Sequence, residues 1–283
     1  MYLARRWKRQ PQGPVEIDRN GPLGRRASGV FTPRSAYTGG GVIVPTPIGL
    51  GAEDAADAQV FILPRDVAFQ SADAVSVFVY GWLGTSSGSA SPTFSTRGTA
   101  SGSGNRRGFE LGVRAGSLFN GFVQFIDSSG NRDGGQEITD SSSVGAEWNN
   151  KPAMLVYDIS RDTLSRATMR AKRPDMGSEF VSATGTSTTI YGNDTANANA
   201  PRIGGQFAGL TASADFGVAL ALWQIGPSTA EQRAAFYDNP YQILRPRTLR
   251  IYSLPASGIP VLSGSTVIDI GQTSARPRVT ITF

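Results

Sequence analysis

The sequence contains no cysteine and no histidine. A Ser-His-Asp triad, a Cys-His pair and the usual zinc sites each need an imidazole or a thiolate near neutral pH, so this chain can form none of them. Disulfide bonds are excluded too, so stability does not depend on an oxidising compartment. These absences remove most hydrolase mechanisms, and we expect a protein that is not an enzyme.

Long apolar runs are also absent. The longest, at residues 218–223, is far too short to span a bilayer. No apolar stretch of signal-peptide length follows the basic start of the chain. We therefore expect a soluble protein that is made in a cytoplasm and does not insert into membranes.

Positive charge is concentrated at the two ends. Residues 1–34 hold eight Lys/Arg against Glu16 and Asp18, and residues 240–283 hold five Arg against Asp269. The whole chain has a net charge of +5, so the part between these ends is mildly acidic. This asymmetry predicts terminal segments that dock onto an acidic partner, either a protein or a nucleic acid.

Between the ends, short apolar runs alternate with Gly, Ser, Asn and Pro. This spacing is typical of an all-β sandwich or barrel. The runs at 122–126 and 154–159 are almost continuously apolar, which predicts central strands buried on both faces. The expected strands cover residues 42–44, 60–63, 75–83, 108–113, 121–127, 153–159, 166–171, 201–204 and 216–224.

One short helix is expected near residue 230. Ser228 and Glu231 have the spacing of a capping box, in which each side chain bonds the backbone of the other residue. The Asn239-Pro240 pair ends the helix, and Phe236 or Tyr237 packs it on the sandwich. Residues 84–105 and 127–135 have the composition of long polar loops.

The chain divides into three parts. Residues 1–35 are rich in Arg, Gly and Pro and predict an extended basic anchoring arm, whose deletion leaves the sandwich folded. Residues 36–254 form the sandwich. Residues 255–283 contain two short strands, which need a partner because an isolated two-stranded hairpin is marginal in water.

The order of these segments resembles the laminin-G-like, or concanavalin A-like, antiparallel jelly roll of tailed-bacteriophage virion proteins. Residues 241–246 and 5–13 carry the phage character, and residues 274–283 resemble the truncated start of a fibronectin-like module. The segments that carry the fold resemblance lie at 78–83, 108–112, 148, 154–158, 202–205, 216–225 and 236–240.

The resemblance implies a fold more than a function, because this jelly roll serves in lectins, receptors, glucanases and structural proteins. The family's Trp-His-His lead into the fourth strand is reduced here to Trp148-Asn149-Asn150. The glucanase pattern Glu-x-Asp-x-x-Glu is absent, and the calcium ligands of the animal family have no clear counterpart.

Candidate chemical groups are few. A glycosidase needs two facing carboxyl groups; the acid that we single out is Glu110, in the expected strand 108–113, where we expect it to face solvent or an arginine. The acids between Glu53 and Asp57 are expected on a solvated surface. We expect no cofactor; calcium is the alternative, since loop oxygens can bind it. Its candidate ligands are Asp127, Asp133, Asn193 and Asp194.

Aromatic platforms for glycan stacking are Trp82, Trp148, Tyr191 and Trp223, of which Tyr191 lies in a polar segment and is the glycan-stacking candidate. The partner-anchoring residues of the arm are Arg5, Arg6, Trp7, Lys8, Arg9, Arg25 and Arg26.

Two hypotheses follow. The first is a structural protein of the virion, a decoration or appendage of head, neck or tail that is anchored by its basic arm. Its partners are other virion proteins and further copies of itself, with a trimer expected. The alternative is a receptor-binding tail fibre protein that recognises host surface carbohydrate through the loops at 84–107 and 128–135.

Overall fold

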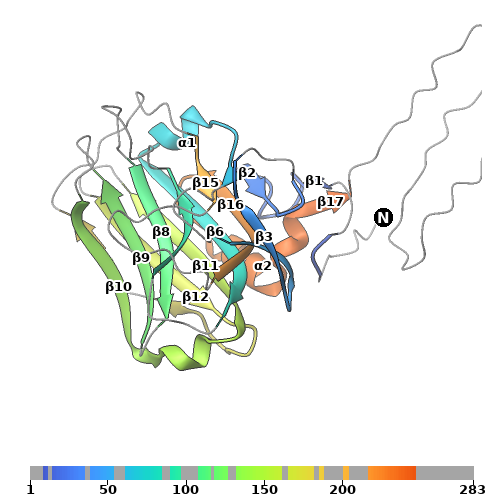
Figure 1. Cartoon of the computed structure of the whole chain (residues 1–283). Helices are drawn as coiled ribbons and strands as arrows, with labels where there is room; N and C mark the ends of the chain where they lie inside the picture. Colours follow the sequence, from blue (N-terminus) through green and yellow to red (C-terminus); the bar gives the residue numbers. More distant parts are fainter. Residues whose placement is uncertain are drawn as a thin grey trace, which may run out of the picture.

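The computed structural model shows an all-β antiparallel jelly-roll sandwich, as predicted (Figure 1). It describes residues 9–11, 15–35, 39–53, 61–84, 90–96, 108–115, 118–126, 132–160, 165–181, 185–187, 200–203 and 216–246. Neither α-helix in this described part is long or apolar enough to cross a membrane.

One layer is a six-stranded sheet in the order β10-β9-β8-β7-β15-β5. Each neighbouring pair in it is antiparallel. Its strands are β5 (Phe61–Ile62), β7 (Ala90–Ser95), β8 (Gly108–Ala115), β9 (Leu118–Ile126), β10 (Arg132–Val144) and β15 (Arg202–Ile203).

The other layer is a nine-stranded sheet in the order β13-β12-β11-β6-β16-β4-β3, with β14 also paired to β12 and β2 to β16. Its long central strands are β6 (Ala74–Leu83), β11 (Lys151–Ser160) and β16 (Phe216–Ile225). The remaining strands are β2 (Ala27–Phe31), β3 (Val42–Thr46), β4 (Gly49–Glu53), β12 (Ser165–Lys172), β13 (Phe180–Val181) and β14 (Gly185–Ser187).

The main core lies between the two sheets. Side chains alternate across a strand, so Val75, Val77 and Val79 of β6 all face this core. Phe94 of β7 and Phe109 of β8 meet them from the six-stranded sheet. Helix α1 (Val67–Ser71) contributes Phe69, whose ring centroid lies 6.1 Å from that of Phe94.

A second core covers the opposite face of the nine-stranded sheet. Phe78, Val156 and Leu222 point away from the main core and are fully buried. Helix α2 (Ala230–Asp238) and the 3-10 helix η2 (Pro240–Ile243) cover them, and Phe78 and Phe236 pack edge to face. Figure 1 shows α2 on the side of this sheet away from β8, β9 and β10. The predicted burial of residues 154–159 on both faces is thus confirmed for β11.

The helices α2 and η2 form a third layer over the nine-stranded sheet, and the N-terminal part of the chain completes it. Strand β1 (Val15–Ile17) pairs with β17 (Leu244–Pro246), and β2 pairs with β16. Leu23 is fully buried in the second core. Gly29 lets β2 approach Trp223, because a Cβ there would lie 2.1 Å from the indole ring. Residues 15–31, which we expected in an extended arm, are therefore built into the fold.

Gln10 fastens the chain further upstream. Its Oε1 accepts a hydrogen bond from the backbone N–H of Leu50 at 2.6 Å, and its Nε2 donates to the carbonyl of Leu50 at 2.8 Å. The side-chain amide thus pairs with β4 as a strand residue would. Gln10 is buried, whereas its neighbour Arg9 is exposed.

All nine predicted strands are present, with small shifts at their ends. The polar segment 84–105 also contains a strand, β7, and the described part has a second short helix, α1. The capping box of α2 lies one residue later than predicted: Thr229 and Gln232 form it, in place of Ser228 and Glu231. Ser228 instead bonds Asp158 through both its backbone N–H and its hydroxyl. The predicted helix end at Asn239 and the packing through Phe236 are confirmed.

Candidate functional site

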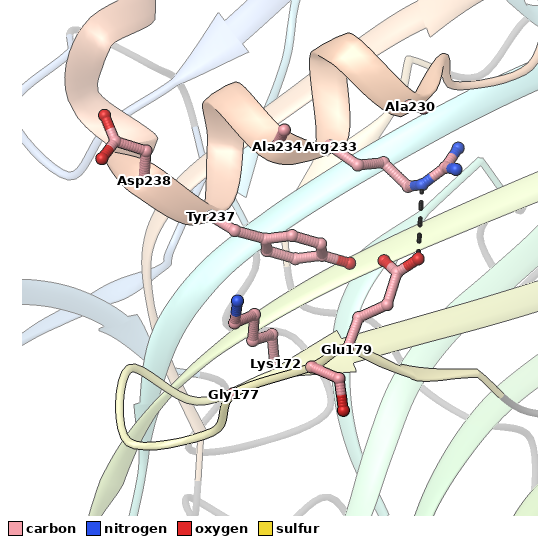
Figure 2. Close-up of a pocket in the computed structure, with 9 residues that line it drawn as sticks. Lys172, Gly177, Glu179, Ala230, Arg233, Ala234, Tyr237 and Asp238 are labelled. Carbon is pink, nitrogen blue, oxygen red and sulfur yellow. Dashed lines mark ion pairs between the residues drawn. The ribbon is translucent and has the colours of Figure 1, made fainter.

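Helix α2 lines a cleft of about 490 Å³ with one stripe of its surface (Figure 2). The stripe consists of Ala230, Arg233, Ala234, Tyr237 and Asp238. These positions follow the i, i+3, i+4, i+7, i+8 spacing of one helical face. The opposite face, with Gln232 and Phe236, is buried against the sheet. The helix therefore separates a packed side from a side open to a ligand.

The opposite wall comes from the end of β12 and the turn that leads to β13. Lys172 closes β12, and Gly177, Ser178 and Glu179 form the turn. The ammonium of Lys172 lies 5.6 Å from the centroid of the Tyr237 ring, within cation–π range. Gly177 faces open space, since a Cβ there would meet nothing within 4 Å.

Figure 2 shows the hydroxyl of Tyr237 pointing toward the carboxylate of Glu179. Burial, and then the negative charge of Glu179, raise the pKa of Tyr237 far above its usual range. The phenol therefore stays protonated at physiological pH and cannot act as a base. Toward a carboxylate, such a protonated phenol can serve as a hydrogen-bond donor.

Glu179 is held by two arginines. Its Oε1 lies 3.7 Å from Nε of Arg233 and 4.0 Å from Nε of Arg170. Arg233 also donates from Nη1 to the carbonyl oxygen of Ser228 at 3.0 Å. Because both ends of the Arg233–Glu179 pair are tied to other groups, the polar wall of the cleft is already oriented before any ligand arrives.

Asp158 lies beneath this wall and connects it to the sheet. Its Oδ2 accepts from Nη1 of Arg170 at 2.5 Å and from the Ser228 hydroxyl at 2.8 Å. Its Oδ1 accepts from the Ser228 backbone N–H at 2.7 Å and the Ser76 hydroxyl at 2.9 Å. This network ties β6, β11 and β12 to the segment just before α2.

A second polar group lies on the outer face of the six-stranded sheet. Phe109 and Leu111 face the main core, so the residue between them, Glu110, faces away from it. Ser95 is the register partner of both Glu110 and Arg202, and its hydroxyl donates to Glu110 Oε1 at 3.4 Å. Glu110 is only 1% exposed. Of the two surroundings that we expected for Glu110, solvent is therefore wrong, and an arginine stays a prediction.

Two of the four aromatic platforms are excluded. Trp148 and Trp223 belong to the main core, where they are 1% and 3% exposed. Trp82 is half-buried on β6. Tyr191, the glycan-stacking candidate, lies outside the described residues, and its role stays a prediction.

The calcium candidates are largely untested. Asp127, Asn193 and Asp194 lie outside the described residues, and Asp133 is described only as a backbone position of β10 opposite Phe125. Within the described part, no group of three Asp or Glu residues is arranged to hold a metal ion.

The structure describes only some of the predicted anchoring residues of the N-terminal arm. Arg5, Arg6, Trp7 and Lys8 lie outside the described residues, and Arg9 and Arg25 are exposed. Arg26 is exposed as well, and it donates to the backbone carbonyl of Ile225 at 3.0 Å. Arg26 thus also helps to hold the N-terminal segment on β16.

Lys172, Glu179, Arg233 and Tyr237 were not predicted as site residues. The helical spacing of residues 230, 233, 234, 237 and 238 was visible in the sequence. However, the two faces of so short and polar a helix have similar composition. The sequence therefore does not tell which face packs on the sheet and which one is left open to a ligand.

No protein-family model and no curated protein matches this chain. Among solved structures, it is similar to the Ruminococcus gnavus IT-sialidase CBM40 bound to alpha2,3 sialyllactose, at 11% identity and a TM-score of 0.45. That match covers 75% of this chain and 98% of the other.

Two further similar structures are longer chains. The enzymatically active domain of bacteriophage CBA120 tailspike protein 2 has 13% identity and a TM-score of 0.47, with 76% of this chain and 32% of that one covered. The receptor binding domain of botulinum neurotoxin D has 11% identity and a TM-score of 0.46, with 74% and 47% covered. At these identities the likeness concerns the fold alone.

Proposed function

We propose that this chain is a non-catalytic structural protein of a tailed-bacteriophage virion, a decoration or appendage that is anchored through its basic ends. The observation that carries the proposal is the pairing of β1 with β17, in which Val15 lies opposite Pro246. The segment that follows Pro246 therefore starts beside β1, while the segment that precedes Val15 is held once more on β4 by Gln10. A body held there on one side projects its remaining surface outward.

The positions of the basic residues support this arrangement. Residues 1–14 hold four Lys/Arg and no acid, and residues 247–283 hold four Arg against Asp269. Pro11 is buried and only four residues from Val15, so it lies within about 14 Å of the β1–β17 pair. Positive charge from both ends of the chain thus starts from one region, which favours docking on an acidic surface.

The resemblance to phage virion proteins, carried by residues 5–13 and 241–246, supports a protein surface of the head, neck or tail as the partner. Among the described residues we find no set of catalytic groups that would contradict a non-catalytic role. The only buried acid on a central strand of the six-stranded sheet, Glu110, is enclosed, and the chain has neither histidine nor cysteine.

The test is incorporation into particles. A full-length chain with Arg5, Arg6, Lys8 and Arg9 all changed to Glu should be lost from purified virions, while its thermal melting stays unchanged. The control changes Arg5, Arg6 and Arg9 to Lys, which keeps the charge. Incorporation is measured by quantitative mass spectrometry of purified particles. The proposal is wrong if the Glu variant is incorporated at the wild-type level.

Carbohydrate recognition is the second candidate function. The observation that favours it is the α2 cleft, which is open and lined by an aromatic ring and fixed polar groups. Ligand sites commonly have volumes of about 300–1,000 Å³ and combine apolar walls with a few oriented polar groups. A glycan array probed with the full-length chain tests this candidate, and binding to no glycan on it would count against it.

A further inference from the structure

We infer that the α2 cleft binds an uncharged saccharide unit, with Tyr237 and the alanines of α2 against its ring and Lys172 and Glu179 bonding its hydroxyl groups. This inference rests on the second proposed function and gives it a site and a ligand class. It does not depend on where the protein is anchored.

The charge of the cleft favours a neutral ligand. Two cations, Lys172 and Arg233, line it together with two carboxylates, Glu179 and Asp238. The summed charge of the lining is zero, so a ligand with net charge of either sign gains no long-range attraction. An uncharged polar molecule meets no opposing charge and loses less hydration on entry.

The pattern of donors and acceptors points to hydroxyl groups. The Lys172 ammonium donates only, and within the described part no carboxylate lies at ion-pair distance from it, so its donors can serve a ligand. Glu179 accepts only, and Ser178 does both. A ligand that satisfies all three must donate and accept at neighbouring positions. Vicinal hydroxyls of a sugar ring do so.

The apolar part of the lining fits the other side of such a ring. Ala230 and Ala234 present small methyl groups along the same helical face as Tyr237. Aromatic side chains with a polar tip offer a flat apolar surface and one hydrogen bond. The C–H face of a sugar can lie on this surface while its hydroxyls reach the opposite wall.

The wall does not need to reorganise when the ligand binds. Glu179 is held between Arg233 and Arg170, and Arg170 is in turn held by Asp158. Fixing such groups in advance removes the entropy cost of ordering them on binding. A network of partly buried charges thus lowers the entropy cost of binding, which matters most for a ligand that binds weakly through hydroxyl groups.

The experiment begins with the full-length chain on an array that carries both neutral and acidic glycans, followed by titration calorimetry with the strongest neutral saccharide. Gly177→Leu fills the cleft without strain, since its Cβ meets nothing within 4 Å. Lys172→Met removes the donor but keeps an unbranched side chain that is only one atom shorter. Ala68→Leu on α1 is the matched control, because it adds an exposed side chain of the same size elsewhere.

We expect Lys172→Met to bind the neutral saccharide about tenfold more weakly or worse, since a hydrogen bond to a charged group contributes that much, and Gly177→Leu to bind at least as weakly because its side chain occupies the space of the ligand. The control should bind as the wild type does, and added salt should leave the affinity unchanged. Binding that persists in Gly177→Leu overturns the cleft as the site but leaves carbohydrate recognition standing. Binding restricted to acidic glycans overturns the ligand class. Binding to no glycan overturns both.

Discussion

Asp158 shows how one side chain can hold the nine-stranded sheet and the start of helix α2 together. It is 16% exposed, and its two oxygens accept hydrogen bonds from Arg170, Ser76 and Ser228. Ser228 directly precedes the capping box of α2, so the position of the helix depends on a carboxylate of β11. Without Asp158, several donors would remain poorly solvated and unpaired.

Asp158→Ala should therefore destabilise the fold by about 3 kcal/mol, the cost of leaving a partly buried arginine without its carboxylate. The measurement is the urea midpoint followed by circular dichroism. Asp175→Ala is the control: Asp175 also pairs with basic residues, Lys151 and Arg173, but its side chain is 50% exposed. Equal losses in the two variants would contradict the structural role of Asp158.

Asp175 itself gives a prediction for acid pH. Hydrogen bonds from Lys151 and then Arg173 lower its pKa from 3.8 to about 2. A carboxyl with a lower pKa in the folded state contributes stability that is complete above the unfolded pKa and is lost as the pH falls toward the folded one. Between pH 4 and pH 2, the wild type should thus lose more stability than Asp175→Asn.

Thermal melts of both proteins at half-unit pH steps measure this difference. Above pH 5 the gap between their melting temperatures should be constant, because Asp175 is then ionised in both the folded and the unfolded state. A gap that keeps changing between pH 5 and pH 7 would be inconsistent with the assignment to Asp175.

At the scale of elements, Gln10 acts as a one-residue strand. Gln10→Ala removes the side-chain partners of both backbone groups of Leu50, and Nε2 also lies 3.5 Å from the carbonyl of Ala219. We expect a loss of about 1–2 kcal/mol and faster hydrogen exchange at the Leu50 amide. Arg9→Ala, one residue away and exposed, should leave that exchange unchanged. Equal protection in the two variants would show that Gln10 does not hold β4.

The elements that the sequence predicted are those with dense apolar or β-branched runs, such as β6, β11 and β16. Strands β2 and β4 were missed because they contain glycine, which usually signals a turn. Here Gly29 makes room for Trp223, and Gly51 lies where a Cβ would be 2.9 Å from Gly217. These glycines permit close packing within a sheet, which only the folded structure reveals.

The cleft was unpredictable for a different reason. Its two walls lie more than fifty residues apart in the sequence, at 172–179 and 230–238. They meet because β12, β11, β6 and β16 pair in that order and α2 folds back over them. Strand order depends on long-range pairing, which local periodicity does not specify.

At the scale of the whole molecule, the fold has three layers. We had expected a two-layered sandwich and, separate from it, an N-terminal arm. Residues 15–26 and 230–246 together cover a face of the nine-stranded sheet that bears Phe78, Leu220 and Leu222, and residues 27–31 add strand β2 to that sheet, with Phe31 in the main core. This arrangement explains why a polar, Arg-rich stretch retains Leu23 and Phe31. It also changes the consequence of removing the N-terminal segment.

Deleting residues 1–8 should leave the melting temperature unchanged, whereas deleting residues 1–31 should expose the second core and cause unfolding or aggregation. Size-exclusion chromatography and thermal melting of both truncated proteins separate these outcomes. A folded, soluble monomer after the longer deletion would show that the N-terminal part of the second core is dispensable, as a free N-terminal arm would be.

The pairing of β1 with β17 also has a mechanical consequence. Val15 and Pro246 are register partners, and Gln10, upstream of Val15, is bonded to β4. Tension that pulls the two extensions apart acts first on the Gln10 hydrogen bonds and then on this short ribbon, whose hydrogen bonds open one at a time. Tension that pulls both in the same direction moves the sandwich as a unit. The load therefore reaches the short ribbon before it reaches the long central strands, so a small pull on a projecting body opens the ribbon while the core keeps its shape.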